Sequence, residues 1–303
     1  MAPDISVIIV SWNARDFLVG CLKSIQETMT DLRYEVIVVD NASSDGSPEA
    51  VLTGFPDVRL IQTGKNLGFS KGNNIGMTES RGRYYFLINS DVVLRPGCAQ
   101  RLLAFMQKNP RTGLAGPRLF NGDGSYQPSC RKMPNLHRHI ARALFVNSSL
   151  VDNGYRQQAS KRVEVLAGSF WVARREAVDV VGKLDEQFFF YGEDVDWCLR
   201  FGKAGWQINY VTDAEAIHYG GSSTSRDTAR FSVQLHKAAL QFWKKHYAPP
   251  AVGIYLAFAV IHNLLRLIIY LIVSIVPWRF RVEANKKAKM HVETIRWFLS
   301  GTH

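Results

Sequence analysis

Short apolar runs alternate with helical patterns over the first third of the chain, and this alternation constrains the fold more than any other feature. The runs are rich in Val, Ile, Leu and aromatic residues, as expected for strands buried on both faces. They occupy residues 5–10, 34–40, 58–63 and 84–89. Helical patterns follow at 16–26 and 70–80, and Pro48 and Pro96 mark two further helix starts. We therefore predict an α/β fold with a mostly parallel sheet flanked by helices.

Polar residues follow three of these strands, at the sheet edge where ligands of such folds bind. They are Ser11, Asn13, Asp40, Asn41, Asp45, Asn89, Ser90 and Asp91. A carboxylate at Asp40 can accept from a uracil or thymine imide or from ribose hydroxyls, although a self-satisfied turn explains the same pattern. Asp91 suits Mg²⁺ or Mn²⁺, which take oxygen ligands and share substrate phosphates, although a helix-capping role is the alternative.

A second acidic cluster lies at Glu193, Asp194 and Asp196, between aromatic residues. Crowding against aromatic rings and other acids raises the proton affinity of a carboxylate, which suits a general base. On a helix, neighbouring positions diverge, so Asp194 and Asp196 are expected to serve different roles. The alternative is an acid-rich first helical turn favoured by the helix dipole.

Together these motifs resemble the GT-A glycosyltransferases of family 2. The motifs are, in chain order, SVIIVSWN, VVDNASSDGS, NLGFSKGNNIG, LINSDV, AGSFWVARREA, VGKLDEQFFFYGEDVDWCLR and AIHYGG. Within that family the chain resembles bacterial rhamnosyltransferases of surface polysaccharide synthesis. The resemblance covers roughly residues 4–245. It implies an inverting enzyme that transfers a sugar from a nucleotide diphosphate-sugar donor.

The resemblance also implies roles for the polar residues at the strand ends. Asp40 matches the family's base-binding acid, with Asn41 beside it. The other residues expected around the nucleotide are Ser11, Asn13, Asn66, Lys71, Asn89 and Ser90. The small residues 220–225 (GGSSTS) are expected to close over the phosphates.

For the chemistry, the resemblance assigns a metal ligand and a base. Asp91 matches the ligand of Mg²⁺ or Mn²⁺, and His218 matches a histidine that reaches the metal, although a satisfied strand-end histidine is the alternative. Asp194 matches the catalytic base, with Glu193 and Asp196 as supports on the acceptor side. The motif departs from the family's Asp-x-Asp pattern because it begins with Asn89, and an amide adds no negative charge to a metal site.

The substrates follow from the resemblance only in outline. A dTDP-rhamnose donor is favoured, but UDP-sugars remain open because Asp40 treats thymine and uracil alike. The expected acceptor is a glycan or a lipid-linked sugar such as a polyprenyl-diphosphate derivative.

Beyond a predicted catalytic domain at 1–245, residues 246–303 form an apolar helix with a basic tail. Residues 251–276 are long enough to span a bilayer, but His262, Asn263 and Arg266 near the centre make a span costly. A single span would place the lysines and arginines that follow it on the side opposite the catalytic domain. That arrangement contradicts the positive-inside rule if the catalytic domain is cytoplasmic. We expect a helix in the interface of an anionic membrane, or a homodimer seam, with a buried core helix and a true span as alternatives.

Charge and cysteine usage limit the other possibilities. The net charge of +11 indicates an anionic partner without choosing among phosphorylated substrates, lipids and nucleic acid. The four cysteines are scattered and no signal peptide is readable, so we expect the cytoplasmic face of the cell membrane. A non-catalytic polyanion-binding module is disfavoured by the acids at the strand ends, and we expect no nucleic-acid partner. A sugar nucleotidyltransferase is disfavoured because SWNARDF after the first strand lacks glycine.

Overall fold

The chain forms two compact units in a computed structural model that describes residues 3–145, 160–220, 228–275 and 281–300. One unit, the sheet unit, comprises Met1–Met133 and Gly154–Ser222. The other, the helical unit, comprises Pro134–Asn153 and Ser223–His303. The predicted domain boundary at residue 245 remains a prediction, while the contacts place residues 228–245 with the C-terminal helices.

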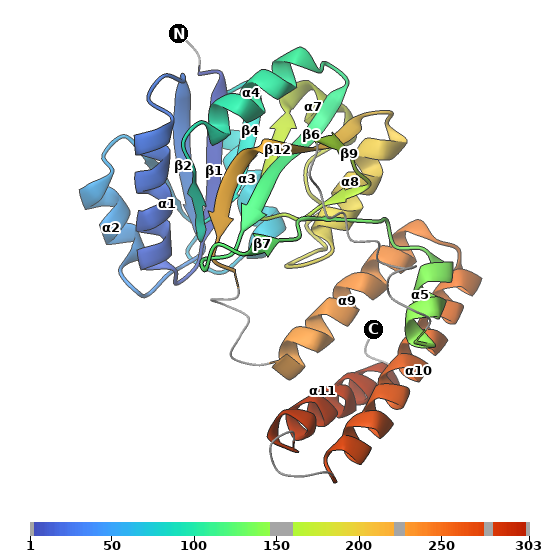
Figure 1. The fold of residues 1–303 in the computed structure, drawn as a ribbon. Helices are drawn as coiled ribbons and strands as arrows, with labels where there is room; N and C mark the ends of the chain where they lie inside the picture. The colour runs from blue at the N-terminus through green and yellow to red at the C-terminus, as the bar shows by residue number, and fades with distance from the viewer. Residues whose placement is uncertain (1–2, 146–159, 221–227, 276–280, 301–303) are drawn as a thin grey trace. The chain divides into compact units, whose positions relative to one another are not determined.

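A sheet with the strand order β3-β2-β1-β4-β11-β6-β12-β5 runs through the sheet unit (Figure 1). Its strands are β1 (Ile5–Ser11), β2 (Tyr34–Asp40), β3 (Arg59–Gln62), β4 (Tyr84–Asn89), β5 (Val92–Leu94), β6 (Thr112–Phe120), β11 (Phe170–Arg174) and β12 (Gln207–His218). The short strands β7 (Tyr126–Gln127) and β9 (Lys161–Arg162) pair with β6 and β12, and β8 (Cys130–Arg131) pairs with β10 (Val165–Leu166). This confirms the α/β class.

The first four strands are parallel, as the alternation of strands and helices predicts. The remainder of the sheet is mixed, because β11 runs antiparallel to both β4 and β6, and β12 runs antiparallel to β5. The backbone N–H of Asn89 donates to the carbonyl of Ser169 at 3.0 Å, which ties the end of β4 to the start of β11.

Helices cover both faces of the parallel strands (Figure 1). They are α1 (Arg15–Thr28), α2 (Ser47–Gly54), α3 (Gly68–Glu79), α4 (Cys98–Lys108), α7 (Arg175–Val181) and α8 (Glu193–Lys203). On one face, Ile5, Val7 and Ile9 share an apolar core with α1 and α4. On the other face α3 lies close to β1, since a Cβ at Gly72 would come within 2.8 Å of Val10 Cγ1. Gly76 stands one turn further along, against Ile8, so two glycines permit this close approach.

The strand register places the expected nucleotide residues side by side. Ser11 is aligned with Asp40, and Val10 with Asn89, so the carboxyl ends of β1, β2 and β4 coincide. Adjacent strands lie about 4.8 Å apart. The three strand ends therefore form one polar edge.

The helical unit consists of α5 (Leu136–Ala143), α9 (Thr228–His246), α10 (Pro249–Val273) and α11 (Arg281–Leu299). α11 packs against both α9 and α10. Asn263 of α10 is buried, and its Oδ1 lies 2.8 Å from Nδ1 of His291 in α11. Among the described residues α10 is the one helix long and apolar enough to cross a membrane, and only 11% of its most apolar 18-residue stretch is buried.

Candidate active site

Asp40 and Ser11 present unpaired polar atoms at the aligned strand ends. Asp40 is 2% exposed, and its Oδ2 accepts from the N–H of Ser43 at 3.0 Å, as in the self-satisfied turn. Its Oδ1 and the Ser11 hydroxyl are buried and have no hydrogen-bond partner among the residues that the structure describes. Buried polar atoms are paired in most native structures, so these two are suited to the imide and hydroxyl groups of a nucleoside.

Three of the expected nucleotide residues hold the surrounding loops. Asn13 Oδ1 accepts from the N–H of Ser44 at 2.7 Å, which ties the end of β1 to the loop after β2. Asn41 donates to the carbonyl of Gly68 at 3.1 Å, and Asn66 Oδ1 accepts from the N–H of Gly68 at 2.9 Å. These amides therefore fix the glycine-containing loop next to the strand ends.

The same loop is joined to the segment that precedes α8. Gly68 has φ +82°, and a Cβ there would lie 2.5 Å from the carbonyl oxygen of Phe189. The N–H of Phe69 donates to that oxygen at 2.7 Å. Lys71 pairs with Glu186 at 3.3 Å. The motifs NLGFSKG and FFFYGED, which are distant in sequence, are thereby brought together within the sheet unit.

Asp91 and His218 lie together where β5 pairs with β12. Asp91 immediately precedes β5, whose Val92 is opposite His218, and His218 Nε2 is 3.3 Å from Asp91 Oδ1. Adjacent ligands of an octahedral Mg²⁺ or Mn²⁺ with bonds of about 2.1 Å are separated by about 3 Å, so the pair fits one edge of such a site. In the described ranges no group of three or more His, Cys, Asp or Glu side chains could hold a metal.

Asn89 and Ser90 connect this pair to β4, and both are half-buried at the turn before Asp91. The structure places Asn89 at the end of β4, opposite Val10 of β1, whose next residue Ser11 is aligned with Asp40 on the far side. Gly220 lies beside His218, and the remainder of the expected phosphate-closing segment, 221–225, lies outside the described residues.

Glu193 opens α8 with a buried side chain whose Oε2 has no hydrogen-bond partner. Burial, with the negative charge of Asp194 next to it, raises the pKa of Glu193 to about 8. The high proton affinity expected for the acidic cluster thus falls on Glu193. At neutral pH it is mainly a neutral acid that can donate a hydrogen bond.

Asp194 is held by an arginine that the sequence analysis did not select. Its Oδ2 pairs with Arg131 Nη2 at 2.5 Å, and its Oδ1 accepts from the N–H of Val195 at 2.8 Å. The charge of Asp194 raises the pKa of Arg131. Each carboxylate oxygen still has a lone pair, so the pair orients Asp194 and leaves it able to accept a proton.

Asp196 is directed to a different partner and is fully buried. Its Oδ2 accepts from Arg200 Nε at 2.8 Å, and Arg200 also donates to the carbonyls of Val181 and Lys183. The divergence expected between Asp194 and Asp196 is thus present in the contacts. Asp196 anchors the loop between α7 and α8.

Two site residues, Gln127 and Arg131, were missed because both lie in short strands of the irregular middle region. Gln127 Oε1 is 2.7 Å from His218 Nδ1. The turn-rich NGDGS between the apolar run of β6 and the polar YQ is a hairpin signal that would have placed Gln127 beside a strand end. No comparable signal marks Arg131.

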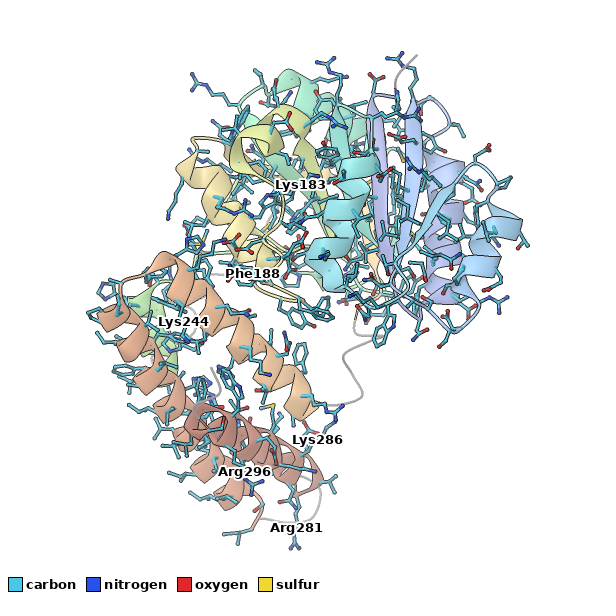
Figure 2. All side chains as sticks on the ribbon, turned by 180° about the vertical axis from the view of Figure 1, so that it is seen from behind. Lys183, Phe188, Lys244, Arg281, Lys286 and Arg296 are labelled. Atoms are coloured by element: carbon cyan, nitrogen blue, oxygen red, sulfur yellow. The ribbon has the colours of Figure 1, made fainter. Side chains whose placement is uncertain are left out.

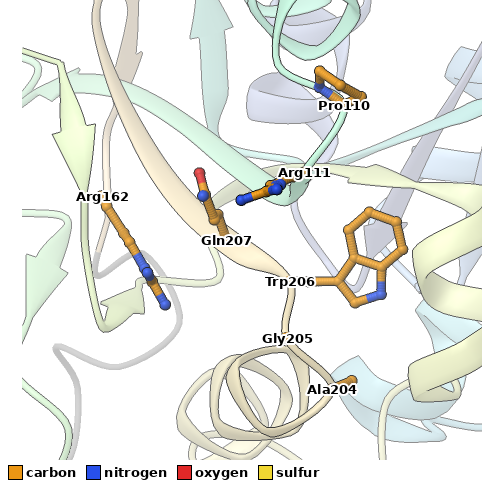
Figure 3. A pocket seen from close by; sticks show the side chains of 7 residues that line it. All are labelled: Pro110, Arg111, Arg162, Ala204, Gly205, Trp206 and Gln207. Atoms are coloured by element: carbon orange, nitrogen blue, oxygen red, sulfur yellow. The ribbon is translucent and has the colours of Figure 1, made fainter.

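A separate cavity of about 470 Å³ lies at the other end of β6 and β12 (Figure 3). Arg111, Arg162 and Trp206 are among its lining residues, and it contains no acid. None of the expected site residues lines it. It is therefore distinct from the polar edge.

A solved structure with the same architecture shows which fold the chain has. The chain is similar to the mannosyltransferase PcManGT of Pyrobaculum calidifontis, whose structure contains GDP-Man and Mn²⁺. The similarity covers 100% of this chain and 89% of that chain, with a TM-score of 0.61 and 14% identity. At this identity the likeness establishes the fold, which is the GT-A fold.

The family model for glycosyl transferase family 2 matches residues 6–182, and the chain belongs to that family. It is 35% identical over 260 residues to the N-acetylglucosaminyl-diphospho-decaprenol L-rhamnosyltransferase of Mycobacterium tuberculosis, covering 80% of this chain and 84% of that protein. It is 25% identical to the dTDP-rhamnosyl transferase RfbF of Shigella flexneri, covering 80% of this chain and 78% of the relative. The resemblance inferred from the motifs is confirmed, and the chain is a glycosyltransferase.

Proposed function

We propose that this glycosyltransferase transfers L-rhamnose from dTDP-rhamnose to a sugar linked to polyprenyl diphosphate, with inversion at the anomeric carbon. The observation that carries the proposal is the polar edge, where unpaired atoms of Ser11 and Asp40 adjoin the Asp91–His218 pair. The choice of rhamnose and of the lipid-linked acceptor rests on the activities of the relatives from Mycobacterium tuberculosis and Shigella flexneri.

The strand ends are the donor half of this site. Asp40 Oδ1 accepts the imide N–H of thymine, or of uracil if the donor is a UDP-sugar, and Ser11 binds the nucleoside beside it. Asp91 and His218 would hold the divalent metal beside the donor's diphosphate. When bound, Mg²⁺ or Mn²⁺ supplies Lewis-acid stabilisation of the charge that builds on the leaving diphosphate.

The first turn of α8 is the acceptor half. Asp194, oriented by Arg131, takes the proton of the acceptor hydroxyl. As it does so, the hydroxyl oxygen attacks the anomeric carbon of the donor sugar from the face opposite the diphosphate, and the bond from that carbon to the diphosphate breaks. Glu193 donates a hydrogen bond from its neutral carboxyl and so supports the acceptor. Asp196 acts through the fold, because its fully buried carboxylate pairs with Arg200, which in turn donates to the carbonyls of Val181 and Lys183.

For the helical unit we propose attachment to the cytoplasmic face of the membrane without crossing it. Isoleucines and leucines line one side of α10 and are 37–59% exposed, at Ile254, Ile261, Leu264, Ile268, Leu271 and Ile272. The opposite side carries Tyr255, Ala259 and Asn263, which are buried. A helix with one packed face and one exposed apolar face can rest in the membrane interface on that exposed face.

The basic helix α11 also argues against a span. It packs against α10, so a span of α10 would carry the charged side chains of α11 into the hydrocarbon at a large cost. Figure 2 shows Arg281, Lys286 and Arg296 along this helix. Arg279 of the expected basic tail lies outside the described residues. Homodimerisation through the apolar face is the competing arrangement.

The donor assignment is tested with the purified full chain, Mn²⁺ or Mg²⁺, and a panel of nucleotide sugars. We expect dTDP-rhamnose to raise the melting temperature most, with dTDP alone giving part of the shift, and EDTA to abolish the effect. A UDP-sugar that stabilises the protein more would change the donor and retain the reaction class. No response to any sugar nucleotide would contradict the proposal.

Membrane attachment is tested by sedimentation with phosphatidylglycerol–phosphatidylcholine vesicles. Ile268→Asp with Ile272→Asp is expected to weaken binding more than tenfold, since each change removes an exposed apolar side chain worth about 1 kcal/mol or more in the interface. Leu52→Asp is the matched control, because Leu52 is 60% exposed on α2 in the sheet unit. Equal binding by all three proteins would exclude α10 as the attachment surface.

A further inference from the structure

A chain of hydrogen bonds runs from the turn between β6 and β7 to the ring of His218. Its members, here called the turn relay, are Asp123, Ser125, Asn121, Gln127 and His218. β7 pairs with the end of β6, with Leu119 opposite Gln127, so the relay is built into the hairpin. No catalytic step proposed above uses its first four members.

The direction of the first bonds is fixed by a carboxylate. Asp123 Oδ1 accepts from the Ser125 hydroxyl at 2.6 Å and from the Ser125 N–H at 2.9 Å. An ionised carboxylate can only accept, so the serine hydroxyl hydrogen is committed to it. Ser125 Oγ is left as an acceptor, and Asn121 Nδ2 donates to it at 2.8 Å.

Asn121 therefore presents its oxygen to Gln127, and Gln127 Nε2 donates to it at 2.7 Å. The same nitrogen donates to the backbone carbonyl of His218 at 3.1 Å. Because a carbonyl oxygen can only accept, the Gln127 atom that faces it must be the amide nitrogen. Both contacts orient the Gln127 amide in the same sense. Its Oε1 then faces His218 Nδ1 at 2.7 Å, and this nitrogen must carry the hydrogen.

The remaining ring nitrogen of a neutral His218 is consequently a lone-pair atom, 3.3 Å from Asp91 Oδ1. Two acceptors that face each other at this distance favour a cation shared between them. We propose that the turn relay, acting through Gln127, fixes the Nε2 lone-pair tautomer of His218 and so prepares it as a metal ligand. Gln127 is a positioning residue in this proposal, which rests on the metal role of Asp91 and His218 under Proposed function.

A purely structural role for the hairpin predicts a different outcome. If Gln127 only held β7 to β12, its loss would lower stability and leave the tautomer of His218 unchanged. Hydrogen-bonded partners of metal-ligating histidines contribute about 10- to 100-fold to metal affinity, so the relay has a measurable consequence.

The tautomer is read from ¹⁵N NMR of the full chain labelled at histidine, recorded above pH 8 without metal. The chain has eight histidines, and the His218 signals are assigned by their absence in His218→Ala. We expect a protonated Nδ1 and an unprotonated Nε2 in the wild type, and a shift toward protonated Nε2 in Gln127→Leu. Mn²⁺ affinity measured by titration with dTDP present is expected to fall 10- to 100-fold in Gln127→Leu.

Gln100→Leu is the matched control, since Gln100 also bonds a backbone carbonyl, that of Thr28, but lies on α4. It should change neither the tautomer nor the Mn²⁺ affinity. A wild-type His218 with protonated Nε2, or a Gln127→Leu variant with unchanged tautomer and Mn²⁺ affinity, would overturn the relay. If His218→Ala and Asp91→Asn retained full Mn²⁺ affinity, the metal assignment would fail instead, and the NMR result would still decide the tautomer.

Discussion

The strand-end edge and the first turn of α8 both bury carboxylates, but the two regions leave them in opposite states. At the edge, Asp40 Oδ1 and Ser11 Oγ have no partner, and Asp91 faces the acceptor nitrogen of His218. At α8, Asp194 and Asp196 are each paired with an arginine. The edge is thus incomplete without a ligand, whereas the helix turn is largely satisfied before any substrate binds.

In the proposed mechanism this difference separates two tasks of one reaction. A metal and a nucleotide bring their own charge and hydrogen-bond donors, so the atoms that receive them are left unpaired. A base must be held in one orientation while the acceptor approaches, so its carboxylate is fixed by the protein. Glu193 is the exception on α8, because its Oε2 is unpaired and its pKa is raised by burial and by Asp194.

The largest expected effect is that of Asp194→Asn, which removes the base and retains its shape. Turnover should fall by about 100- to 10,000-fold, the range for loss of a general base, with nucleotide affinity within about threefold of wild type. Steady-state transfer rates and calorimetric dTDP binding measure the two quantities. A fully active variant would assign the base elsewhere.

Asp196→Asn sharpens the contrast within α8. Breaking a buried ion pair costs about 3–5 kcal/mol, so Asp196→Asn should lower the melting temperature. Asp194→Asn changes the pair with the half-exposed Arg131 and should largely keep the wild-type melting temperature. If Asp196→Asn instead keeps its stability and loses only turnover, Asp196 is the base and the structural role belongs to Asp194.

At the edge, Asp91→Asn should reduce turnover by about 100- to 1,000-fold, because an amide leaves the charge on the departing diphosphate less stabilised. Removal of the divalent metal by EDTA should have an effect at least as large and be reversed by Mn²⁺ or Mg²⁺. If the turnover of Asp91→Asn were reduced by the same factor at every metal concentration, Asp91 would have a role other than metal binding.

Asp40→Asn tests the unpaired atoms of the edge directly. Losing a charge-assisted hydrogen bond should weaken dTDP binding by roughly 1.5–3 kcal/mol, about 10- to 150-fold in Kd. Asp45→Asn is the control in the same loop, because Asp45 bonds the N–H groups of Arg15 and Ser47 within the protein. Similar losses in both variants would mean that Asp40 only shapes the turn.

The smallest effect is a change in how stability depends on pH. The pKa of Glu193 is about 8 in the folded chain and near 4.5 unfolded, so the unfolded state releases this proton first. The stabilising contribution is complete below about pH 4.5 and is lost as pH rises to about 8. Glu193→Gln should therefore lose less stability between pH 5 and 8, by up to a few kcal/mol.

Melting temperatures across that pH range measure this effect. Glu49→Gln is the control, since Glu49 also lies in a first helical turn but is exposed. A pH dependence of Glu193→Gln that matches wild type would show that Glu193 titrates normally.

The first half of the fold was predictable because its strands are continuous apolar runs. The strands predicted at 34–40 and 84–89 coincide with β2 and β4. The antiparallel strands were less accessible, since β7, β8, β9 and β10 are each two residues long and carry no period that a sequence can show. Their order in the sheet depends on contacts between distant segments.

The candidate site residues were selected in two ways, and their roles remain predictions. The strand-end rule selected Asp40 and Asp91, and the family resemblance selected Asp194 and His218. The partners Arg131 and Gln127 were missed, because each is supplied by a two-residue strand from the irregular middle of the chain. Sequence also could not show which acid of the cluster has the raised pKa, since that depends on where each side chain is buried.

The most direct test is transfer by the full chain from dTDP-rhamnose to an N-acetylglucosaminyl-diphospho-polyprenol in vesicles with Mn²⁺, with analysis of the product's anomeric configuration. A single displacement from a β-linked donor predicts an α-linked rhamnosyl product, formed by wild type, lost with EDTA and nearly lost in Asp194→Asn. A β-linked product, or undiminished transfer by Asp194→Asn, would contradict the account.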